Sequence, residues 1–116
     1  MFFERMGFTL SIEVKEIQFE NYGNCIQISN GLIDVVVTID FGPRIVRFGK
    51  IGEDNTLYMD LDRKFCNQNE KMDEYYWKGA TFQSYGGHRV WISPERMPQT
   101  YYPDNEPVVY LSLIHI

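Results

Sequence analysis

One stretch of alternating side chains constrains the fold of this chain more than any other feature. Residues 33–39 read IDVVVTI, and every second position holds a β-branched apolar residue: Ile33, Val35, Val37 and Ile39. Because successive side chains of a strand point to opposite faces, this pattern predicts a half-buried β-strand. Asn30 and Gly31 come just before it and are a strong signal for a two-residue hairpin turn. The sequence therefore predicts an antiparallel hairpin whose second strand is 33–39.

Strand signals dominate the remaining sequence as well, and no helical period extends over a long window. We expect strands at 12–19, 25–29, 33–39, 44–48 and 57–59. Residues 60–77 are rich in charged and amide side chains and predict a long surface excursion with one helical turn. Residues 99–107 must be loop because two prolines bracket their end. The pattern favours an all-β chain that begins as an antiparallel meander.

Length and composition predict one small domain with a hydrophobic core. It has 116 residues, of which 44% are hydrophobic and 16% aromatic, too many for a disordered segment. The formal charge is −5, and the eleven Lys and Arg are scattered rather than clustered. A phosphate backbone needs a basic face, so nucleic acid is not an expected partner.

The sequence also bears on compartment and redox state. Charged residues in the first six positions do not fit a signal peptide, and no stretch approaches membrane-spanning length. We therefore expect a cytoplasmic protein with no membrane partner. Cys25 and Cys66 lie far apart without a CxxC spacing, so no zinc site or disulfide framework is indicated. Two reduced, partly buried thiols are expected, and a single bridge between them stays open.

The last six residues, 111–116, read LSLIHI. They match the translation of a transposase adapter used in sequencing libraries. The alternative is a natural closing strand at 108–114, which is apolar and β-prone. We expect residues 1–110 to be the amino-terminal part of one β-sandwich domain and residues 111–116 to be a non-native tail.

The densest group of chemically useful residues follows two glycines. Gly86 and Gly87 allow the backbone to come close to another group, because glycine has no Cβ. If 88–92 is a strand, Arg89 and Trp91 share one face. A guanidinium beside an indole suits a sugar, because one donates hydrogen bonds and the other offers an apolar ring face. The alternative is structural: Arg89 pairs with Asp104 or Glu95, and Trp91 is core.

Two further residues complete the candidate site. His88 can donate to a substrate oxygen or act as a general acid near neutral pH, although histidines next to glycines are often structural. Arg44 reaches the same pocket if its strand is a neighbour; otherwise it is a surface cation. The candidate substrate-binding residues are His88, Arg89, Trp91 and Arg44.

Other chemistries lack support in the sequence. Ser93 has no Gly-x-Ser-x-Gly elbow around it and no obvious base. The acidic residues Glu95, Asp104 and Glu106 lack metal-ligand spacing, and no dinucleotide or P-loop pattern occurs. We therefore expect no metal and no cofactor.

Two stretches together resemble a known family. The run NGLIDVVV at 30–37 leading into FGPRIV at 41–46, followed by YGGHRVW at 85–91 and on to Glu95, resembles the amino-terminal part of galactose mutarotase-like proteins. The resemblance covers about residues 25–110, and it is closest to uncharacterised members rather than to the aldose 1-epimerases.

The resemblance implies a large antiparallel β-sandwich with a carbohydrate in the concave groove of its broad sheet. Family epimerases open the sugar ring with a histidine acid and a glutamate base from later in the chain, and hold the sugar with an early arginine and histidine. By position, Arg89 and His88 are the candidates for these two. The chain departs from the epimerases, with Gly-Gly-His-Arg-Val-Trp in place of an Asn-Arg-Ile type segment. No residue is assigned as catalytic base.

The expected function is thus a fragment of a carbohydrate-binding domain, an aldose epimerase or related carbohydrate-active enzyme in full length, with a sugar or sugar phosphate as partner. A non-catalytic carbohydrate-recognition module and a structural β-domain are the alternatives.

Overall fold

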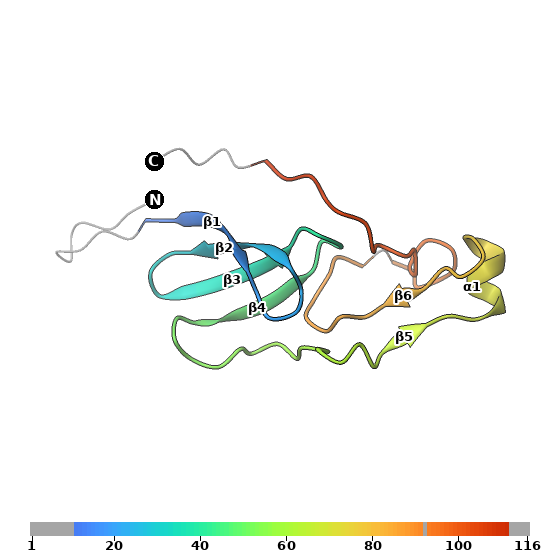
Figure 1. The fold of residues 1–116 in the computed structure, drawn as a ribbon, viewed down its shortest axis with the longest axis horizontal. Helices are drawn as coiled ribbons and strands as arrows, with labels where there is room; N and C mark the ends of the chain where they lie inside the picture. Colours follow the sequence, from blue (N-terminus) through green and yellow to red (C-terminus); the bar gives the residue numbers. More distant parts are fainter. Residues whose placement is uncertain (1–10, 92, 112–116) are drawn as a thin grey trace.

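The computed structural model describes residues 11–91 and 93–111 (Figure 1). It is mostly β: a four-stranded antiparallel sheet, a small two-stranded sheet and one short helix. The elements are β1 (Glu13–Gln18), β2 (Asn24–Ser29), β3 (Ile33–Thr38), β4 (Ile45–Lys50), β5 (Cys66–Asn67), α1 (Glu70–Tyr75) and β6 (Phe82–Gln83). The large sheet lies at one end of the molecule, and β5, β6 and α1 lie at the other (Figure 1).

The large sheet is the predicted meander, with strand order β1-β2-β3-β4. Ser29 pairs with Asp34 across the hairpin, and the amide of Asn30 donates to the carbonyl of Ile33, so the turn is centred on Gly31 and Leu32 rather than on Asn30 and Gly31. In that turn Gly31 takes a positive φ of 90°, and the Asn30 side chain accepts the amide of Leu32. The hairpin prediction is confirmed, and the sequence reasoning places the first four strands within two residues of their observed ends.

The buried face of β3 is the opposite of the one that alternation suggests. Val36 and Thr38 are fully buried and Asp34 is 5% exposed, whereas Val35 and Val37 are only half-buried. Polar groups are buried here because they have partners: Asp34 accepts from Arg47 at 3.0 Å and from Gln27 at 2.9 Å. Paired polar side chains can therefore occupy the inner face at little cost.

The core lies between that face and the chain that crosses it. It consists of Tyr22, Cys25, Val36, Phe41, Val46 and Tyr85. The rings of Phe41 and Tyr85 stack with centroids 3.9 Å apart, and the Tyr22 hydroxyl donates to the carbonyl of Tyr85 at 2.5 Å. These contacts hold residue 85, and with it the two glycines that follow, against the sheet.

The other face of the large sheet is an apolar groove of about 460 Å³. On this face the pairing registers place one apolar residue from each strand in a row, and the first two of them line the groove: Val14, Ile28, Val35 and Phe48. Ile28 is 38% exposed and Phe48 46% exposed. Residues 108–111 run over part of this groove, where the amide of Val108 donates to the carbonyl of Ile39 at 2.8 Å.

The excursion at 60–77 carries the short helix that the sequence suggested. Asn69 caps α1 by accepting the amide of Met72 at 3.0 Å, and Met72 is buried beneath the helix. The predicted strand at 57–59 is reduced to a single bridge between Met59 and Gly86. No helix in the described part of the chain has the length and apolar character needed to cross a membrane.

Two strands that the sequence left open are not formed by the described residues. Residues 88–91 do not form a strand: His88 makes one antiparallel bridge with Ile45, and the positive φ of Gly86 and Gly87 turns the chain immediately before it. Residues 108–111 are also not a strand. Ile92 and residues 112–116 lie outside the described residues, so the prediction of a non-native tail stays a prediction.

Both cysteines are free. Cys25 lies in the core, where burial, followed by the nearby charge of Asp40, raises its pKa to about 11. Cys66 is exposed on β5, so the expectation of partial burial is wrong for both thiols.

Candidate functional site

Arg44 enters the site because a turn directs it inward. The Thr38 hydroxyl donates to the carbonyl of Phe41 at 2.8 Å and accepts the amide of Arg44 at 3.0 Å, which closes the loop between β3 and β4. The guanidinium is 3% exposed and donates to the carbonyl of Gln83 at 3.0 Å and to Asp104 Oδ1 at 2.6 Å. Burial lowers the pKa of Arg44, and the charge of Asp104 acts in the opposite direction. The surface-cation alternative for Arg44 is therefore wrong.

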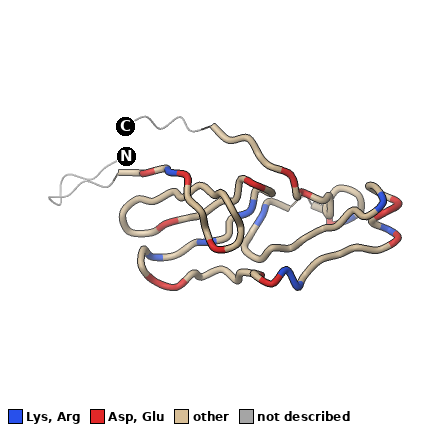
Figure 2. The backbone as a smooth tube through the Cα atoms, viewed as in Figure 1, with Lys and Arg blue, Asp and Glu red and all other residues tan. Residues whose placement is uncertain are grey.

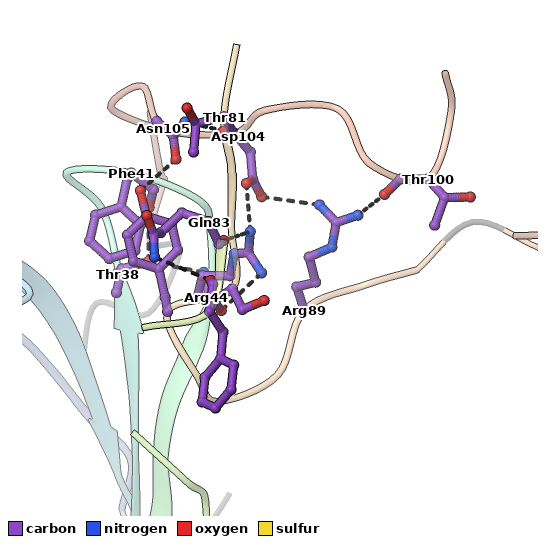
Figure 3. Close-up of polar contacts among 12 residues, drawn as sticks. Thr38, Phe41, Arg44, Thr81, Gln83, Arg89, Thr100, Asp104 and Asn105 are labelled. Carbon is purple, nitrogen blue, oxygen red and sulfur yellow. Dashed lines mark hydrogen bonds and ion pairs between the residues drawn. The ribbon is translucent and has the colours of Figure 1, made fainter. Parts of the chain in front are cut away.

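Arg89 approaches the second oxygen of the same carboxylate. Its Nη1 lies 3.3 Å from Asp104 Oδ2, and its Nη2 donates to the carbonyl of Thr100 (Figure 3). The guanidinium carbon lies 4.3 Å from the centroid of Trp91 and 4.8 Å from that of Phe82. The ion pair with Asp104 that the sequence offered as the structural alternative is present. Arg89 and Trp91 also lie together, as the sugar-platform interpretation requires.

Trp91 is not a core residue, because 50% of its surface is exposed. The ring of Phe82 lies 6.1 Å from it and that of Tyr101 also 6.1 Å, measured between centroids. One part of the indole is thus held by Arg89 and two aromatic rings, while the rest stays open to a ligand.

The paired glycines allow a close approach to the protein's own backbone. The amide of Gly87 donates to the carbonyl of Tyr58 at 2.6 Å, and His88 and Ile45 exchange backbone hydrogen bonds of 2.8 and 2.7 Å. A Cβ on Gly87 would lie 2.1 Å from the carbonyl oxygen of Ile45, which no real side chain tolerates. This contact docks residue 88 beside Ile45, the first residue of β4, which directly follows Arg44.

All four predicted site residues line one small cavity of about 160 Å³: Arg44, His88, Arg89 and Trp91. His88 is exposed, and Phe82 and Ser84 complete part of the wall. Two guanidiniums face one carboxylate here, so the cluster carries a net charge of about +1. The Nε atoms of Arg44 and Arg89 are buried and have no hydrogen-bond partner among the described residues. The cavity therefore favours an anionic or hydroxyl-rich group.

The double role of Asp104 is what sequence reasoning missed. It was a candidate partner of Arg89, but its bond to Arg44 joins residues 60 positions apart and leaves no local signal. Neighbouring Asn105 is anchored too, because it accepts from the Tyr85 hydroxyl at 2.5 Å and donates to the carbonyl of Thr81 at 2.8 Å. The loop at 103–107 is thus bonded at two successive residues to segments far from it in the sequence.

The available chemistry is hydrogen bonding and stacking. Within the described residues, no group of three or more His, Cys, Asp or Glu side chains is placed to hold a metal ion. Along the backbone, Lys and Arg are scattered among Asp and Glu (Figure 2).

No family model, no curated protein and no solved structure matches this chain. The resemblance to galactose mutarotase-like proteins therefore stays a hypothesis about a few motifs. Any function has to be argued from the residues that line the cavity.

Proposed function

We propose that this chain is the carbohydrate-binding part of a galactose mutarotase-like β-sandwich and that its ligand is a sugar or sugar phosphate. One observation carries the proposal. Arg44 lies more than forty positions before the segment that carries His88, Arg89 and Trp91, and yet all four residues line the same cavity.

The size and charge of the cavity favour the phosphorylated form. At about 160 Å³ it is smaller than the roughly 300–1,000 Å³ of common ligand pockets, so it takes one substituent rather than a whole ring. The two positive charges of Arg44 and Arg89 exceed the single negative charge of Asp104 by one, which suits a phosphate or carboxylate on that substituent. The half-exposed Trp91 then offers its apolar surface to the sugar ring.

The open apolar face of the large sheet supports the sandwich part of the proposal. In a sandwich, two sheets bury their apolar faces against each other. The row formed by Val14, Ile28, Val35 and Phe48 is suited to such packing. In the epimerases that the chain resembles, the acid and base come from later segments, and no base is assigned here. Residues 1–116 are therefore proposed to bind sugar without opening its ring.

A structural β-domain without a ligand is the second candidate. The observation that favours it is the pairing of both arginines with Asp104, which fastens the loop at 103–107 to β4. Trp91 distinguishes the two candidate functions, because ion pairs that only hold the loop in place do not need an exposed indole beside them.

Calorimetric titration with galactose, galactose 6-phosphate and glucose 6-phosphate tests the proposal. Trp91→Ala should weaken binding of the phosphorylated sugars by about tenfold, or about 1.4 kcal/mol. Val90→Ala is the matched control, since Val90 is adjacent and 87% exposed. The proposal fails if the wild-type chain binds none of the three sugars at millimolar concentration, or if the two variants bind equally well.

A further inference from the structure

A second pocket lies along the loop at 103–107 and is separate from the cavity that Arg44, Arg89 and Trp91 line. It is formed by residues 77–81 on one side and 102–108 on the other. Its volume is about 540 Å³, against about 160 Å³ for the arginine cavity. This volume falls within the usual range for pockets that hold a small organic ligand.

Two exposed aromatic rings form a corner of this pocket. Trp77 is 48% exposed and Tyr102 56% exposed, with ring centroids 6.0 Å apart and planes at 73°. Tyr76 fixes both rings: it lies 5.5 Å from Tyr102 at 90° and 6.3 Å from Trp77 at 69°. Its own hydroxyl donates to the carbonyl of Pro98 at 2.5 Å. The two aromatic walls are thus held in place before any ligand arrives, which lowers the entropic cost of binding.

The charged groups that line the pocket are carboxylates, which accept hydrogen bonds. Asp104 is already occupied by two arginines, and both ends of the Asn105 amide are bonded. Glu106 is exposed and forms no ion pair with any described residue, and no Lys or Arg is among the described residues that line the pocket. Such a wall accepts hydrogen bonds from hydroxyl groups and repels anions.

The loop that carries these groups is rigidly attached to the sheet. The amide of Gly42 donates to the carbonyl of Asp104 at 2.8 Å, in addition to the two ion pairs of its side chain. Tyr102 and Glu106 lie two residues to either side of this anchor. The folded chain therefore sets their positions relative to Trp77 before a ligand binds.

We propose that this pocket binds a neutral pyranose unit, with Trp77 and Tyr102 packing against the ring and Glu106 accepting from its hydroxyls. Apolar walls with a few acceptors match a sugar, whose C–H faces are apolar and whose rim is rich in donors. The site goes beyond the proposed function, because it needs neither Arg44 nor Arg89 as a ligand contact. Its preference for a neutral sugar is the reverse of that of the arginine cavity.

The chain offers a separate reporter for each pocket, because it contains only two tryptophans, Trp77 and Trp91. In Trp91→Phe, the remaining fluorescence comes from Trp77. Titration of that variant with methyl β-D-glucopyranoside and methyl β-D-galactopyranoside should give a saturable change for at least one of them. Adding Tyr102→Ala should weaken that binding about tenfold, and Glu106→Gln should weaken it by a smaller factor.

Tyr75→Ala in the same background is the matched control. Tyr75 is a tyrosine on α1 with 50% exposure, close to the 56% of Tyr102, and it does not line the pocket. Circular dichroism of each variant checks that folding is retained. The inference is overturned if folded Trp91→Phe gives no saturable change with either glycoside, or if Tyr102→Ala and Tyr75→Ala bind equally.

The reciprocal variant, Trp77→Phe, is titrated with galactose 6-phosphate, and its fluorescence reports Trp91 in the arginine cavity. A response of Trp77 to a glycoside, with no response of Trp91 to galactose 6-phosphate, supports this pocket and counts against the proposed function. A response of Trp91 to galactose 6-phosphate, with no response of Trp77 to either glycoside, overturns the inference and leaves the proposed function standing.

Discussion

At the scale of single residues, Asp104 determines the geometry of both pockets. Each of its two carboxylate oxygens pairs with one arginine: Arg44, just before β4, and Arg89, in the segment after the glycines (Figure 3). The side chains of Arg44 and Arg89 are 3% and 11% exposed, so neither charge can be rehydrated if the carboxylate is lost. A buried charge without its partner is costly, and Asp104 is therefore the side chain whose removal should matter most.

We expect Asp104→Ala to lower the free energy of unfolding by about 3–5 kcal/mol. Urea unfolding followed by circular dichroism measures the loss. Asp62→Ala is the control, because Asp62 and Lys64 form an exposed pair, 78% and 66% accessible, with 3.8 Å between charged atoms. That exposed pair should be worth about 1 kcal/mol or less. Equal losses for the two variants would contradict the assignment of Asp104 as the central partner.

At the scale of elements, the junction between β4 and residues 86–88 brings the site together. The chain turns through two successive glycines with positive φ and then bonds to Ile45 through His88. No other residue type fits at 87, because the carbonyl oxygen of Ile45 occupies the space of a Cβ. The glycines therefore bring Arg89 and Trp91 to the start of β4, which directly follows Arg44.

Two alanine substitutions separate backbone conformation from this close approach. Gly31→Ala, at φ of 90° with nothing within 4 Å of the added Cβ, should cost only the conformational penalty of about 1–2 kcal/mol. Gly87→Ala, at φ of 68°, should cost about 2 kcal/mol more, because it also breaks the two hydrogen bonds between Ile45 and His88. Urea unfolding of the two variants gives the comparison. A Gly87→Ala variant no less stable than Gly31→Ala would show that the junction is not needed.

Local patterns predicted the elements better than they predicted the surroundings of those elements. Period-two alternation and the Asn30-Gly31 turn located β2 and β3, because both signals act within a few residues. The inner face of β3 was not predictable, because the burial of Asp34 depends on Arg47 and Gln27 in neighbouring strands. The strand considered at 88–92 is not formed by residues 88–91, because two glycines with positive φ redirect the chain immediately before them.

The candidate site was likewise predicted only in part, because sequence patterns do not encode contacts between distant segments. Four residues of types typical of sugar binding were identified from the sequence, and the structure brings all four to one cavity. The sharing of Asp104 by two arginines and the corner formed by Trp77 and Tyr102 were missed. Both arise from contacts between segments far apart in the chain, which spacing cannot encode.

At the scale of the whole molecule, the two faces of the large sheet are unequal. One face holds the core and leads to the site, while the other is an apolar groove of about 460 Å³ covered in part by residues 108–111. The last described residues run back along the sheet in Figure 1. An open apolar sheet face is a surface for another layer of structure and is sticky without one.

The groove should bind a hydrophobic dye such as anilinonaphthalene sulfonate. Ile28→Thr, which places a hydroxyl in the groove, should reduce the fluorescence of the bound dye. Leu32→Thr is the control, since Leu32 is 59% exposed but lies in the turn outside the groove. Equal dye signals from the two variants would place the apolar surface elsewhere.

The central claim is that sugar binds where Arg44, His88, Arg89 and Trp91 meet. The most direct test is a titration of the ¹⁵N-labelled chain with galactose 6-phosphate, followed through the indole N–H resonances of Trp77 and Trp91 in a ¹H–¹⁵N correlation spectrum. Each tryptophan lines a different pocket, so the two resonances report the two sites independently. Saturable movement of the Trp91 resonance, abolished by Arg89→Ala in a chain that stays folded, is the predicted result. A Trp91 resonance that does not move at millimolar galactose 6-phosphate would contradict the account.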